Sequence, residues 1–361
     1  MRSPSGYIVL ASAGSGKSTW IAQEVRDRPT ERALVATYTT TNSGRVEERF
    51  WKEAGRLPEW VRVRTWFTFL LEDLVRPFQN VTGWETRIAG IHLAAGISAK
   101  YQSKKDWSYW FNSSGSIYND KISAFAVWCD DASGGAVLRR LVRLYDHIYI
   151  DEVQDMAGHD LDLLERLIKK GVQVTMVGDP RQGTYSTNMA RRNAKFRGES
   201  IREKFEEWKR RKLCSIIEHS HSFRCRPEIC RLADHLFPDY PRIVSKNGDA
   251  TEHDGVYLVR SEHAHHYIGK FRPAVLRWDR RERCLGYDAT NFGESKGQEY
   301  ERVLVFPTGP IGQWIASGNA SKVEKSLAKL YVAITRARQS LGFVYNGTVG
   351  LGDLIQGYWT P

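Results

Sequence analysis

The order of hydrophobic and polar residues predicts strands that alternate with helices in the first half of the chain. Short apolar runs suited to buried strands lie at residues 7–10, 32–38, 61–65, 146–150 and 172–177. Apolar residues with helical spacing follow at residues 17–25, 44–52 and 160–170. Consecutive parallel strands need a long crossover connection, which is usually a helix. The alternation therefore predicts a parallel sheet with helices on both faces.

The second half repeats this alternation over a similar length. Predicted strands lie at residues 213–218, 256–259, 274–276, 302–306 and 341–345, and a predicted helix at 227–237. A further helix is predicted to begin near Ser321, where Ser-Lys-Val-Glu has the spacing of a capping box. We expect two α/β domains, at residues 1–190 and 191–361, with a basic link from Arg191 to Arg197.

The alternation breaks between residues 77 and 143. This segment is rich in aromatic residues: Trp84, Tyr101, Trp107, Tyr109, Trp110, Phe111 and Trp128. We interpret it as a small, mostly helical insertion in the first domain. Its rings and the pair Lys104-Lys105 are of the kind that grip single strands, although at least half of the rings are expected in the insertion's own core.

The first predicted strand runs into a loop of small residues from Ala11 to Gly16, and a predicted helix opens at Lys17. Small residues let backbone N–H groups approach phosphates, and the helix N-terminus adds positive potential. Lys17 would reach the β- and γ-phosphates, and the Ser18 hydroxyl would ligate Mg²⁺. Ala11 replaces the first glycine of the strict pattern, and a plain turn is the alternative. We favour a nucleoside triphosphate site formed by Ala13, Gly14, Ser15, Gly16, Lys17, Ser18 and Thr19.

Two carboxylates, Asp151 and Glu152, follow the predicted strand at 146–150. The carboxyl ends of parallel strands line the ligand crevice of such sheets. Asp151 is suited to hold Mg²⁺ and Glu152 to polarise the water that attacks the γ-phosphate. A bare Asp-Glu pair is common, but together with a phosphate-binding loop it is a strong signal. Gln182 would sense the γ-phosphate and Tyr185 would report that state to a bound strand, unless Gly-Asp-Pro before them is an ordinary turn.

The formal net charge of +11 favours a polyanionic partner, nucleic acid before an acidic membrane surface. The five scattered cysteines do not form a disulfide framework and fit a reducing cytosol. His219, His221 and three of these cysteines invite a zinc interpretation, but the spacing lacks a paired Cys-x-x-Cys. No apolar run approaches the roughly 20 residues that span a bilayer, and no secretory leader is recognisable, so we expect no membrane association.

Six sequence boxes occur in one order: Ala-x-x-Gly-x-Gly-Lys-Ser at 11–18, Asp-Glu-Val-Gln-Asp at 151–155, Gly-Asp-x-x-Gln-x-x-Tyr at 178–185, Ser-Phe-Arg-x-x-Pro-Glu-Ile at 222–229, Glu-Ser-Lys-Gly-Gln-Glu-Tyr at 294–300, and Tyr-Val-Ala-Ile-Thr-Arg-Ala-Arg at 331–338. Together they resemble the UvrD/Rep/PcrA branch of superfamily 1 DNA helicases over residues 7–345. The resemblance implies two RecA-like P-loop domains, each a parallel sheet flanked by helices, with the insertion in the first.

The resemblance also implies roles for individual residues. Lys17 would contact phosphate, Asp151 would bind the metal, and Glu152 would act as the catalytic base. The ligands would be ATP and Mg²⁺. Gln182 and two arginines of the second domain, Arg224 and Arg336, would contact the γ-phosphate. Gly297 and Glu299 match a box whose glutamate touches the ribose. Single-stranded DNA would be contacted by Thr39, Thr40, Asn42, Thr65, Trp66, Phe67 and Tyr185.

The chain departs from the family pattern in three places. The upstream glutamine that reads adenine has no evident counterpart before the loop, and Ser186-Thr187-Asn188 stand where many relatives place a stacking tryptophan. The short interval between Arg224 and Gly297 leaves no room for the large accessory subdomain of these helicases. The resemblance is therefore to a compact form of the family.

From these observations we expect an ATP-dependent helicase or translocase that moves 3′→5′ on single-stranded DNA and unwinds forked duplexes through closure of its two domains. One alternative is a single-strand-stimulated ATPase that remodels protein–DNA complexes without unwinding, alone or with a protein partner. A P-loop kinase is the alternative of a different class, and the basic second half argues against it. The resemblance implies a monomer in the cytoplasm of a bacterium or a phage-infected cell.

Overall fold

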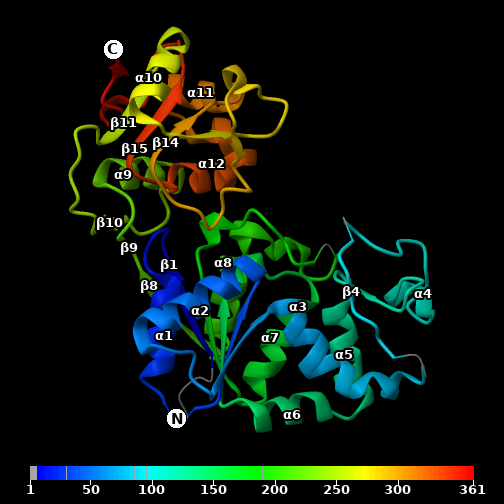
Figure 1. Cartoon of the computed structure of the whole chain (residues 1–361). Helices are drawn as coiled ribbons and strands as arrows, with labels where there is room; N and C mark the ends of the chain where they lie inside the picture. The colour runs from blue at the N-terminus through cyan, green and yellow to red at the C-terminus, as the bar shows by residue number, and fades with distance from the viewer. Residues whose placement is uncertain (1–5, 30, 85–86, 95, 189) are drawn as a thin grey trace. The chain divides into compact units, whose positions relative to one another are not determined.

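The computed structural model describes residues 6–29, 31–84, 87–94, 96–188 and 190–361. These residues form two compact units (Figure 1). Unit 1 comprises the chain up to Leu10 together with Lys17–Glu218, and unit 2 comprises Ala11–Gly16 together with His219–Pro361. The division falls later in the chain than the predicted boundary at residue 190. The loop Ala11–Gly16, although it follows the first strand, groups with unit 2.

Unit 1 is built on a six-stranded sheet in the order β3-β2-β6-β7-β1-β8. The pairs β3–β2, β2–β6, β6–β7 and β7–β1 are all parallel. The strand bounds are β1 (Gly6–Ala11), β2 (Ala33–Thr37), β3 (Val61–Thr65), β6 (His147–Asp151), β7 (Gln173–Gly178) and β8 (Cys214–His219). Five of these six strands were predicted in the first domain, and β1, β2, β6 and β7 are largely buried, whereas only Val61 is buried in the edge strand β3.

The predicted strand at 213–218 is β8, but it belongs to the sheet of unit 1 and not to the second domain. It lies at the edge of the sheet beside β1, where a Cβ on Gly6 would stand 2.9 Å from the carbonyl oxygen of Leu213. An apolar strand carries no information about which of two sheets it joins. Only its position beside β1, which is far away in the sequence, assigns this strand to the sheet of unit 1.

Helices cover both faces of the unit 1 sheet. Alternate strand residues such as Ile8, Leu34 and Ile148 share one hydrophobic core with helices α5 (Ile122–Ala132) and α7 (His159–Lys169). Helices α1 and α2 pack against each other on the other side of the strands (Figure 1). The helices of this unit outside the insertion are α1 (Lys17–Arg26), α2 (Thr40–Ala54), α3 (Trp66–Phe69), α7 (His159–Lys169) and α8 (Ile201–Arg210), with short 3₁₀ segments at η3 (Val153–Asp155), η4 (Pro180–Gln182), η5 (Ala194–Phe196) and η6 (Gly198–Ser200).

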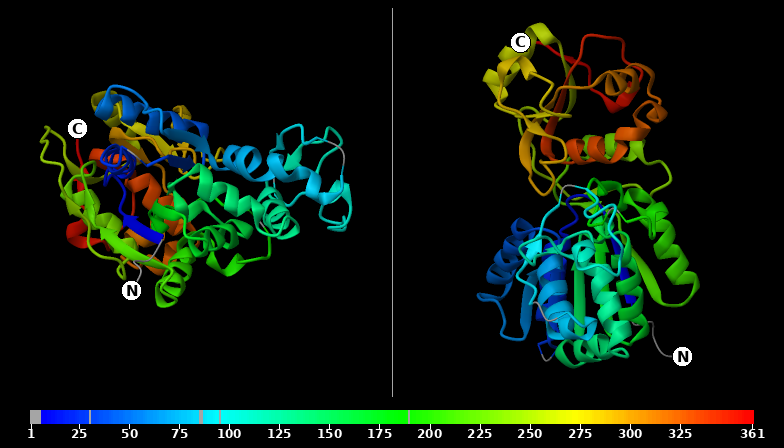
Figure 2. Two further views of the ribbon diagram at one scale, coloured as in Figure 1. Left: turned by 90° about the horizontal axis from the view of Figure 1, so that it is seen from below. Right: turned by 90° about the vertical axis from the view of Figure 1, so that its right-hand side faces the viewer.

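The inserted segment begins where α3 continues into a π-helical turn, η1 (Leu70–Val75), and a 3₁₀ stretch, η2 (Arg76–Thr82). It contains β4 (Ile91–His92), α4 (Trp107–Trp110), β5 (Ile117–Tyr118), α5 (Ile122–Ala132) and α6 (Ala136–Leu144). Figure 2 shows the part around β4 and α4 extending sideways from the strands of unit 1. Trp84, Trp107, Phe111 and Trp128 form a cluster of ring contacts that is continuous with the hydrophobic core of unit 1.

Unit 2 contains a second six-stranded sheet, in the order β13-β12-β14-β15-β11-β16, and all of its pairs are parallel. A separate pair, β10-β9, lies outside it. The bounds are β9 (His221–Ser222), β10 (Val244–Ser245), β11 (Gly255–Val259), β12 (Ala274–Arg277), β13 (Thr290–Asn291), β14 (Tyr300–Val305), β15 (Ala337–Val344) and β16 (Tyr358–Trp359). The helices are α9 (Pro227–Leu236), α10 (Ala264–Phe271), α11 (Gly309–Ser317) and α12 (Leu327–Ile334), with 3₁₀ segments η7 (Ser261–His263), η8 (Cys284–Gly286), η9 (Ala320–Ser326) and η10 (Gly352–Leu354).

The alternation of strand side chains divides the core of unit 2 into two layers. Leu258 and Phe343 point into one layer, which helices α9, α11 and α12 cover. The next residues along the same strands, Val259 and Val344, point into the other layer together with Tyr267 of α10. Both faces of the sheet are therefore covered, as the continuous apolar runs predicted.

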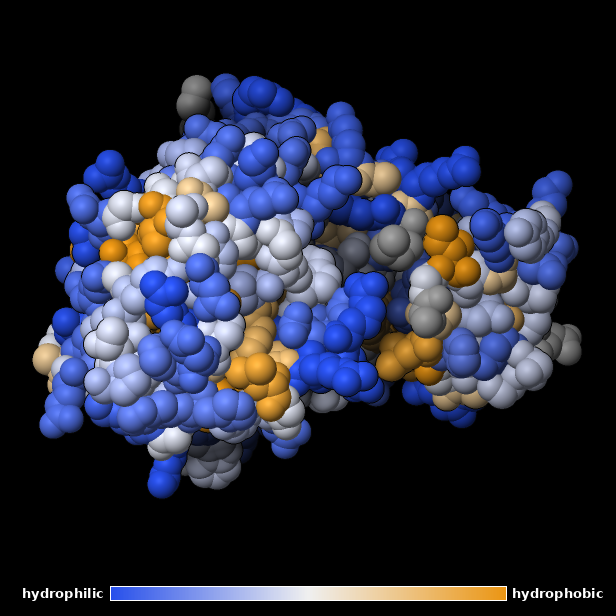
Figure 3. Space-filling model, turned by 90° about the horizontal axis from the view of Figure 1, so that it is seen from above, coloured by the Kyte–Doolittle hydropathy of each residue, from blue (hydrophilic) through white to orange (hydrophobic). Residues whose placement is uncertain are grey.

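Two parallel sheets flanked by helices confirm the predicted fold class, α/β with two RecA-like domains. Among the residues described, no helix combines the length and the apolar character needed to cross a bilayer. The face shown in Figure 3 is covered mainly by hydrophilic side chains, with hydrophobic ones in small scattered groups. All five cysteines are buried thiols, and the described part of the chain has no cluster of three or more potential metal-ligating His, Cys, Asp or Glu side chains.

Candidate nucleotide and nucleic-acid site

The loop Ala11–Gly16 is held by hydrogen bonds to residues 219–223, which belong to the same unit. The Ser12 hydroxyl lies 3.1 Å from the carbonyl oxygen of His219 and 2.8 Å from that of His221. The backbone N–H of Phe223 donates to the carbonyl of Gly14 over 2.8 Å. Ala13 is buried in the core of unit 2. These contacts fix the loop's path independently of any ligand.

Gly14 cannot carry a side chain in this conformation. Its φ is +73°, and a Cβ would stand 2.6 Å from both the Arg224 Cβ and the Ser222 hydroxyl oxygen. Gly16 also has a positive φ, +82°, which turns the chain into helix α1. The glycines of the predicted phosphate loop are therefore required by backbone geometry, and Arg224 lies directly against that loop within unit 2.

The Ser15 hydroxyl is buried and has no hydrogen-bond partner among the described residues. A buried hydroxyl without a partner costs roughly 1–3 kcal/mol. A phosphate oxygen bound in the loop would accept this hydrogen bond, so the residues present fit a nucleotide phosphate.

Helix α1 brings Lys17 and Ser18 to the end of strand β6. The Ser18 hydroxyl lies 3.3 Å from the Asp151 Oδ2, and Asp151 is fully buried. Burial, together with the charge of Glu152, raises the pKa of Asp151 to about 7, and the charge of Lys17 opposes this shift. A divalent cation there would restore the charged carboxylate. Ser18 and Asp151 are oxygen donors of the kind Mg²⁺ prefers, so the predicted pair fits this metal.

Glu152 holds an unusual backbone conformation, with φ 57° and ψ 42°. Left-handed backbone is uncommon for a residue with a side chain, and such strain concentrates at functional sites. The backbone N–H of Glu152 donates to the Asp151 Oδ1 over 2.9 Å, and the Gln154 side-chain amide donates to the Glu152 carboxylate. Glu152 is thus oriented by its neighbours on both sides.

Gln154 and Asp179 are site residues that the sequence reasoning did not select. The Gln154 Oε1 accepts from the backbone N–H of Asp179 over 3.1 Å, which ties the ends of β6 and β7 together. Burial alone would raise the pKa of Asp179, but the charges of Arg181 and Lys17 lower it overall. Both residues lie inside boxes already quoted, at the Gln of Asp-Glu-Val-Gln-Asp and the Asp of Gly-Asp-x-x-Gln. Their positions inside these two boxes were the feature of the sequence that could have identified them.

The predicted sensor Gln182 is buried at the end of η4, beside this network. Its side-chain amide donates to the Asp179 Oδ2 over 3.1 Å. It therefore shares a carboxylate with Arg181, which pairs with Asp179 at 2.8 Å. Asp151, Asp179 and Gln182 are consequently buried at the carboxyl ends of β6 and β7, and the half-buried Lys17 interacts with both carboxylates.

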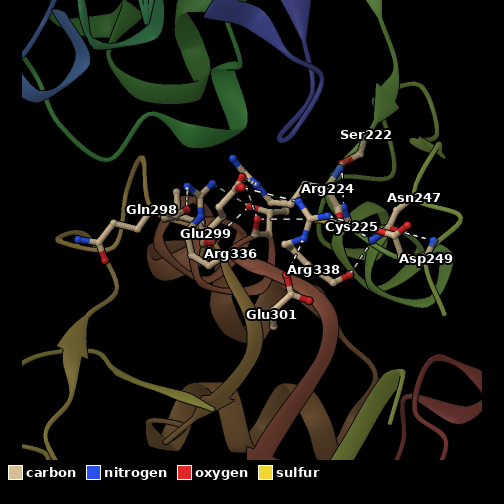
Figure 4. Close-up of polar contacts among 12 residues, drawn as sticks. Ser222, Arg224, Cys225, Asn247, Asp249, Gln298, Glu299, Glu301, Arg336 and Arg338 are labelled. Carbon is tan, nitrogen blue, oxygen red and sulfur yellow. Dashed lines mark hydrogen bonds and ion pairs between the residues drawn. The ribbon is translucent and has the colours of Figure 1, made fainter. Parts of the chain in front are cut away.

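In unit 2, the predicted arginines gather around Glu299 (Figure 4). The Arg224 Nε lies 3.0 Å from the Glu299 Oε2, and an Arg338 guanidinium nitrogen lies 3.7 Å from its other oxygen. Arg336 is buried and donates to the carbonyls of Val332 and Gln298. The structure thus brings Arg224, Arg336 and Glu299 together. Gly297, with φ +84°, turns the chain just before Gln298.

Three of the predicted DNA contacts lie at the start of helix α2. Thr39 caps this helix by accepting from the backbone N–H of Asn42, so the predicted hydroxyl-rich loop is its N-terminal turn. Thr40 and Thr65 line one open groove of about 720 Å³, beside β3. Phe67 is half-buried, 6.1 Å from the ring of Tyr38. The structure therefore brings together Thr39, Thr40, Asn42, Thr65 and Phe67 along one edge of unit 1.

Trp66 differs from its predicted role. It is fully buried, and its indole N–H donates to the Asp160 Oδ1 over 2.8 Å. A ring in the core cannot stack on a base, so we do not retain Trp66 in the DNA surface. Tyr185, by contrast, is exposed. Thr187 and Asn188, which stand near the position of a tryptophan in many relatives, are buried.

A phosphate loop after the first strand and an acidic pair at the end of a neighbouring parallel strand define a P-loop nucleotide-binding protein. Residues 92–197 match the family model of the UvrD/REP helicase N-terminal domain. Over this segment the chain is similar to the UvrD/REP helicases.

Among curated proteins, the chain is 28% identical over 193 residues to an ATP-dependent helicase/nuclease subunit of Carboxydothermus hydrogenoformans. This match covers 53% of the chain and 13% of that protein. Solved structures similar to the chain include the Arterivirus nonstructural protein 10 helicase, at 14% identity and TM-score 0.48, and its complex with DNA, at 15% and 0.48. Each of these alignments covers 97% of the chain and 62% of the helicase. The chain thus spans a small part of the curated relative's length.

Proposed function

We propose that the chain is an ATP-dependent motor of the helicase type, which hydrolyses ATP to move along single-stranded DNA and open forked duplexes. The observation that carries the proposal is the grouping of Lys17, Ser18 and Asp151 with Glu152 inside unit 1. The match to a helicase family supports the use of that hydrolysis on nucleic acid.

Each residue of the group has a chemical task. Lys17 neutralises the terminal phosphates, and the loop's N–H groups and the Ser15 hydroxyl bind their oxygens. Ser18 and Asp151 would hold Mg²⁺, which supplies charge neutralisation of the β- and γ-phosphates. Glu152, oriented by Gln154, accepts the proton of the attacking water. Gln182 would contact the γ-phosphate and transmit its presence through Asp179 to β7.

The second unit would complete the site during catalysis. Arg224 lies against Gly14 of the loop, which supports its assignment to the γ-phosphate. Arg336 and Glu299 belong to the same hydrogen-bonded cluster as Arg224, so all three side chains would respond together to a bound nucleotide. An arginine that contacts the γ-phosphate makes closure of the two units depend on ATP, and hydrolysis would release it.

The strand would lie along the edge formed by Thr39, Thr40, Thr65 and Phe67, with Tyr185 as a stacking ring. The hydroxyl groups are suited to phosphate oxygens and the exposed ring to a base. Movement in the 3′→5′ direction follows the family resemblance. The net charge of +11 predicts that binding weakens steeply with salt.

The test is release of inorganic phosphate from ATP with and without oligo(dT), for the wild type and Lys17→Ala. Lys322→Ala, an exposed lysine of unit 2, is the matched control. We expect single-stranded DNA to stimulate the wild type and the control at least about tenfold, and Lys17→Ala to lose about a thousandfold in rate, the loss of a strong electrostatic contact. Hydrolysis that is insensitive to DNA, or phosphate transfer to a small acceptor without release, would contradict the proposal and favour a kinase.

A further inference from the structure

A second groove of unit 1 lies between the inserted segment and helices α7 and α8. Its volume is about 1170 Å³, and its walls come from residues 97–121, from α7 and α8, and from the connection at 190–193. It shares no lining residue with the groove that contains Thr40 and Thr65. The two grooves are therefore separate surfaces of the same unit.

The lining of this second groove is strongly basic. Nine lysine and arginine side chains face two carboxylates, Asp162 and Glu165, both on α7. Glu165 pairs with Lys169, Lys204 and Arg211 at 2.7, 3.4 and 2.6 Å. Glu207 also pairs with Lys204 and Arg211, and Asp131 pairs with Arg166, so the cations of the α7–α8 wall are partly neutralised. The excess positive charge consequently lies on the remaining parts of the lining.

Lys100, Lys104 and Arg191 carry that excess. All three side chains are exposed, and within the described ranges no carboxylate lies at ion-pair distance from them. Three solvated cations along one groove attract a polyanion with regularly spaced charges.

An exposed ring stands in the same lining. The Tyr101 side chain is 90% exposed, and the Lys100 ammonium lies 5.7 Å from its ring centroid. A tyrosine this exposed contributes nothing to the core, whereas an aromatic face beside a cation is the usual platform for an unstacked base. An acidic protein surface would use the cations but not the ring, and a base-paired duplex would not present its base faces. The combination favours a single strand.

We propose that this groove binds a segment of single-stranded nucleic acid, with phosphates at Lys100, Lys104 and Arg191 and a base on Tyr101. The inference rests on the proposed function, because it adds a second contact surface for the strand on which the motor acts. The connection at 190–193 follows Tyr185, the proposed stacking ring, within a few residues of chain. A short segment therefore joins this groove to that residue. The groove would lengthen the bound strand and raise affinity without taking part in hydrolysis.

The test compares a groove variant, Lys100→Ala/Lys104→Ala/Arg191→Ala, with a control of equal charge loss, Arg280→Ala/Arg283→Ala/Lys322→Ala, whose three side chains are exposed on unit 2. Binding of fluorescent dT oligonucleotides of increasing length is measured by anisotropy at several salt concentrations. Thermal unfolding checks that both variants are folded.

For long oligonucleotides we expect the groove variant to bind about tenfold more weakly than the wild type. The slope of log K against log salt should shrink by about two, because each single-strand phosphate contributes about 0.7. Tyr101→Ala should weaken binding at least about fivefold with an unchanged slope. Short oligonucleotides should bind the groove variant normally and stimulate its ATPase fully at saturation.

Equal weakening in the control variant would assign the effect to net charge and overturn the inference, as would unchanged binding by the groove variant. A loss confined to blunt duplexes would overturn the single-strand assignment. A wild type without DNA-stimulated hydrolysis, combined with the expected groove effects, would instead refute the proposed motor and leave the groove as a binding site. The two failures are therefore distinguishable.

Discussion

Asp160 and Asp151 are both buried carboxyl groups of unit 1, but their surroundings differ. Asp160 accepts hydrogen bonds from the side chains of Trp66, Ser123 and Thr187. Burial raises its pKa, and these three donors oppose that shift. Asp151 has Ser18 and the backbone N–H of Glu152 as donors and lies beside Lys17. The first carboxyl group is satisfied by the protein, whereas the second is suited to a cation.

Replacing Asp160 with alanine should destabilise unit 1 by about 2–4 kcal/mol, because three buried donors lose their acceptor together. Urea unfolding followed by tryptophan fluorescence measures this change. Thr187→Ala removes one donor to Asp160 and also the acceptor of the Ala157 N–H, and it should cost less than Asp160→Ala, about 1–2 kcal/mol. Equal stabilities of Asp160→Ala and the wild type would show that the network does not hold in solution.

At the scale of single residues, the sequence allowed prediction of those whose role depends on local spacing. Lys17, Ser18, Asp151 and Glu152 lie where a strand–loop–helix and a strand end require them. Trp66 was misjudged because a tryptophan after a strand has the same local pattern whether it faces solvent or core. Its burial depends on Asp160, which is 94 residues away in sequence. No local signal contains that pairing.

The loop Ala11–Gly16 is an element whose shape depends on its neighbours in unit 2. Gly14→Ala should abolish ATP hydrolysis, because the added Cβ would stand 2.6 Å from the Arg224 Cβ and displace that arginine or the loop. Gly171→Ala is the matched control: its φ is +89°, but nothing lies within 4 Å of an added Cβ. Both variants carry backbone strain of about 1–2 kcal/mol, so only the clash distinguishes them.

Phosphate release with saturating oligo(dT) compares these two glycine variants, and thermal unfolding compares their stability. A similar loss of hydrolysis in both would mean that strain alone is responsible. Normal hydrolysis by Gly14→Ala would mean that the loop and Arg224 are not packed together as described.

Strand β6 contains a histidine that links stability to pH. Burial, together with the charge of Arg28, lowers the pKa of His147 to about 4. The unfolded chain has a histidine pKa near 6.5, so between pH 6.5 and 4 the unfolded state binds the extra proton. Stability contributed by the neutral ring is therefore complete above pH 6.5 and is lost as the pH falls toward 4.

His147→Gln should remove this pH-dependent part, about 2–3 kcal/mol between pH 6.5 and 4. Unfolding by urea at several pH values measures it. His253 in unit 2, whose pKa burial also lowers to about 4, still adds a slope of the same sign, and Asp151, whose pKa is raised to about 7, adds one of the opposite sign. A variant with the full slope of the wild type would show that His147 is not buried as a neutral ring.

At the scale of elements, local patterns predicted most strands, while their partners depended on distant parts of the chain. The run 213–218 forms a strand, but it joins the sheet of unit 1. The capping box predicted at Ser321 is replaced by a 3₁₀ segment in which Asn319 caps the backbone N–H of Ser321, and the α-helix begins at Leu327. A short 3₁₀ turn and the first turn of an α-helix share the same capping residues, so sequence alone could not separate them.

For the whole molecule, the proposed motor function requires the phosphate loop, the arginines of unit 2 and the two separate grooves of unit 1 to act together. The alternation of apolar runs predicted two parallel sheets, and the order of the sequence boxes led to the helicase family. The rings of the insertion and the pair Lys104-Lys105 were predicted to suit single strands, but the groove itself was not, because its residues come from segments far apart in the sequence. Only the folded chain brings them together.

The most direct test of the motor is ATP-dependent displacement of streptavidin from biotin at either end of a single-stranded oligonucleotide. We predict that the wild type displaces it from the 5′ end much faster than from the 3′ end, and that Lys17→Ala displaces it from neither. Displacement at equal rates with and without ATP, or by Lys17→Ala as fast as by the wild type, would contradict the claim that hydrolysis at Lys17 and Glu152 drives movement along DNA.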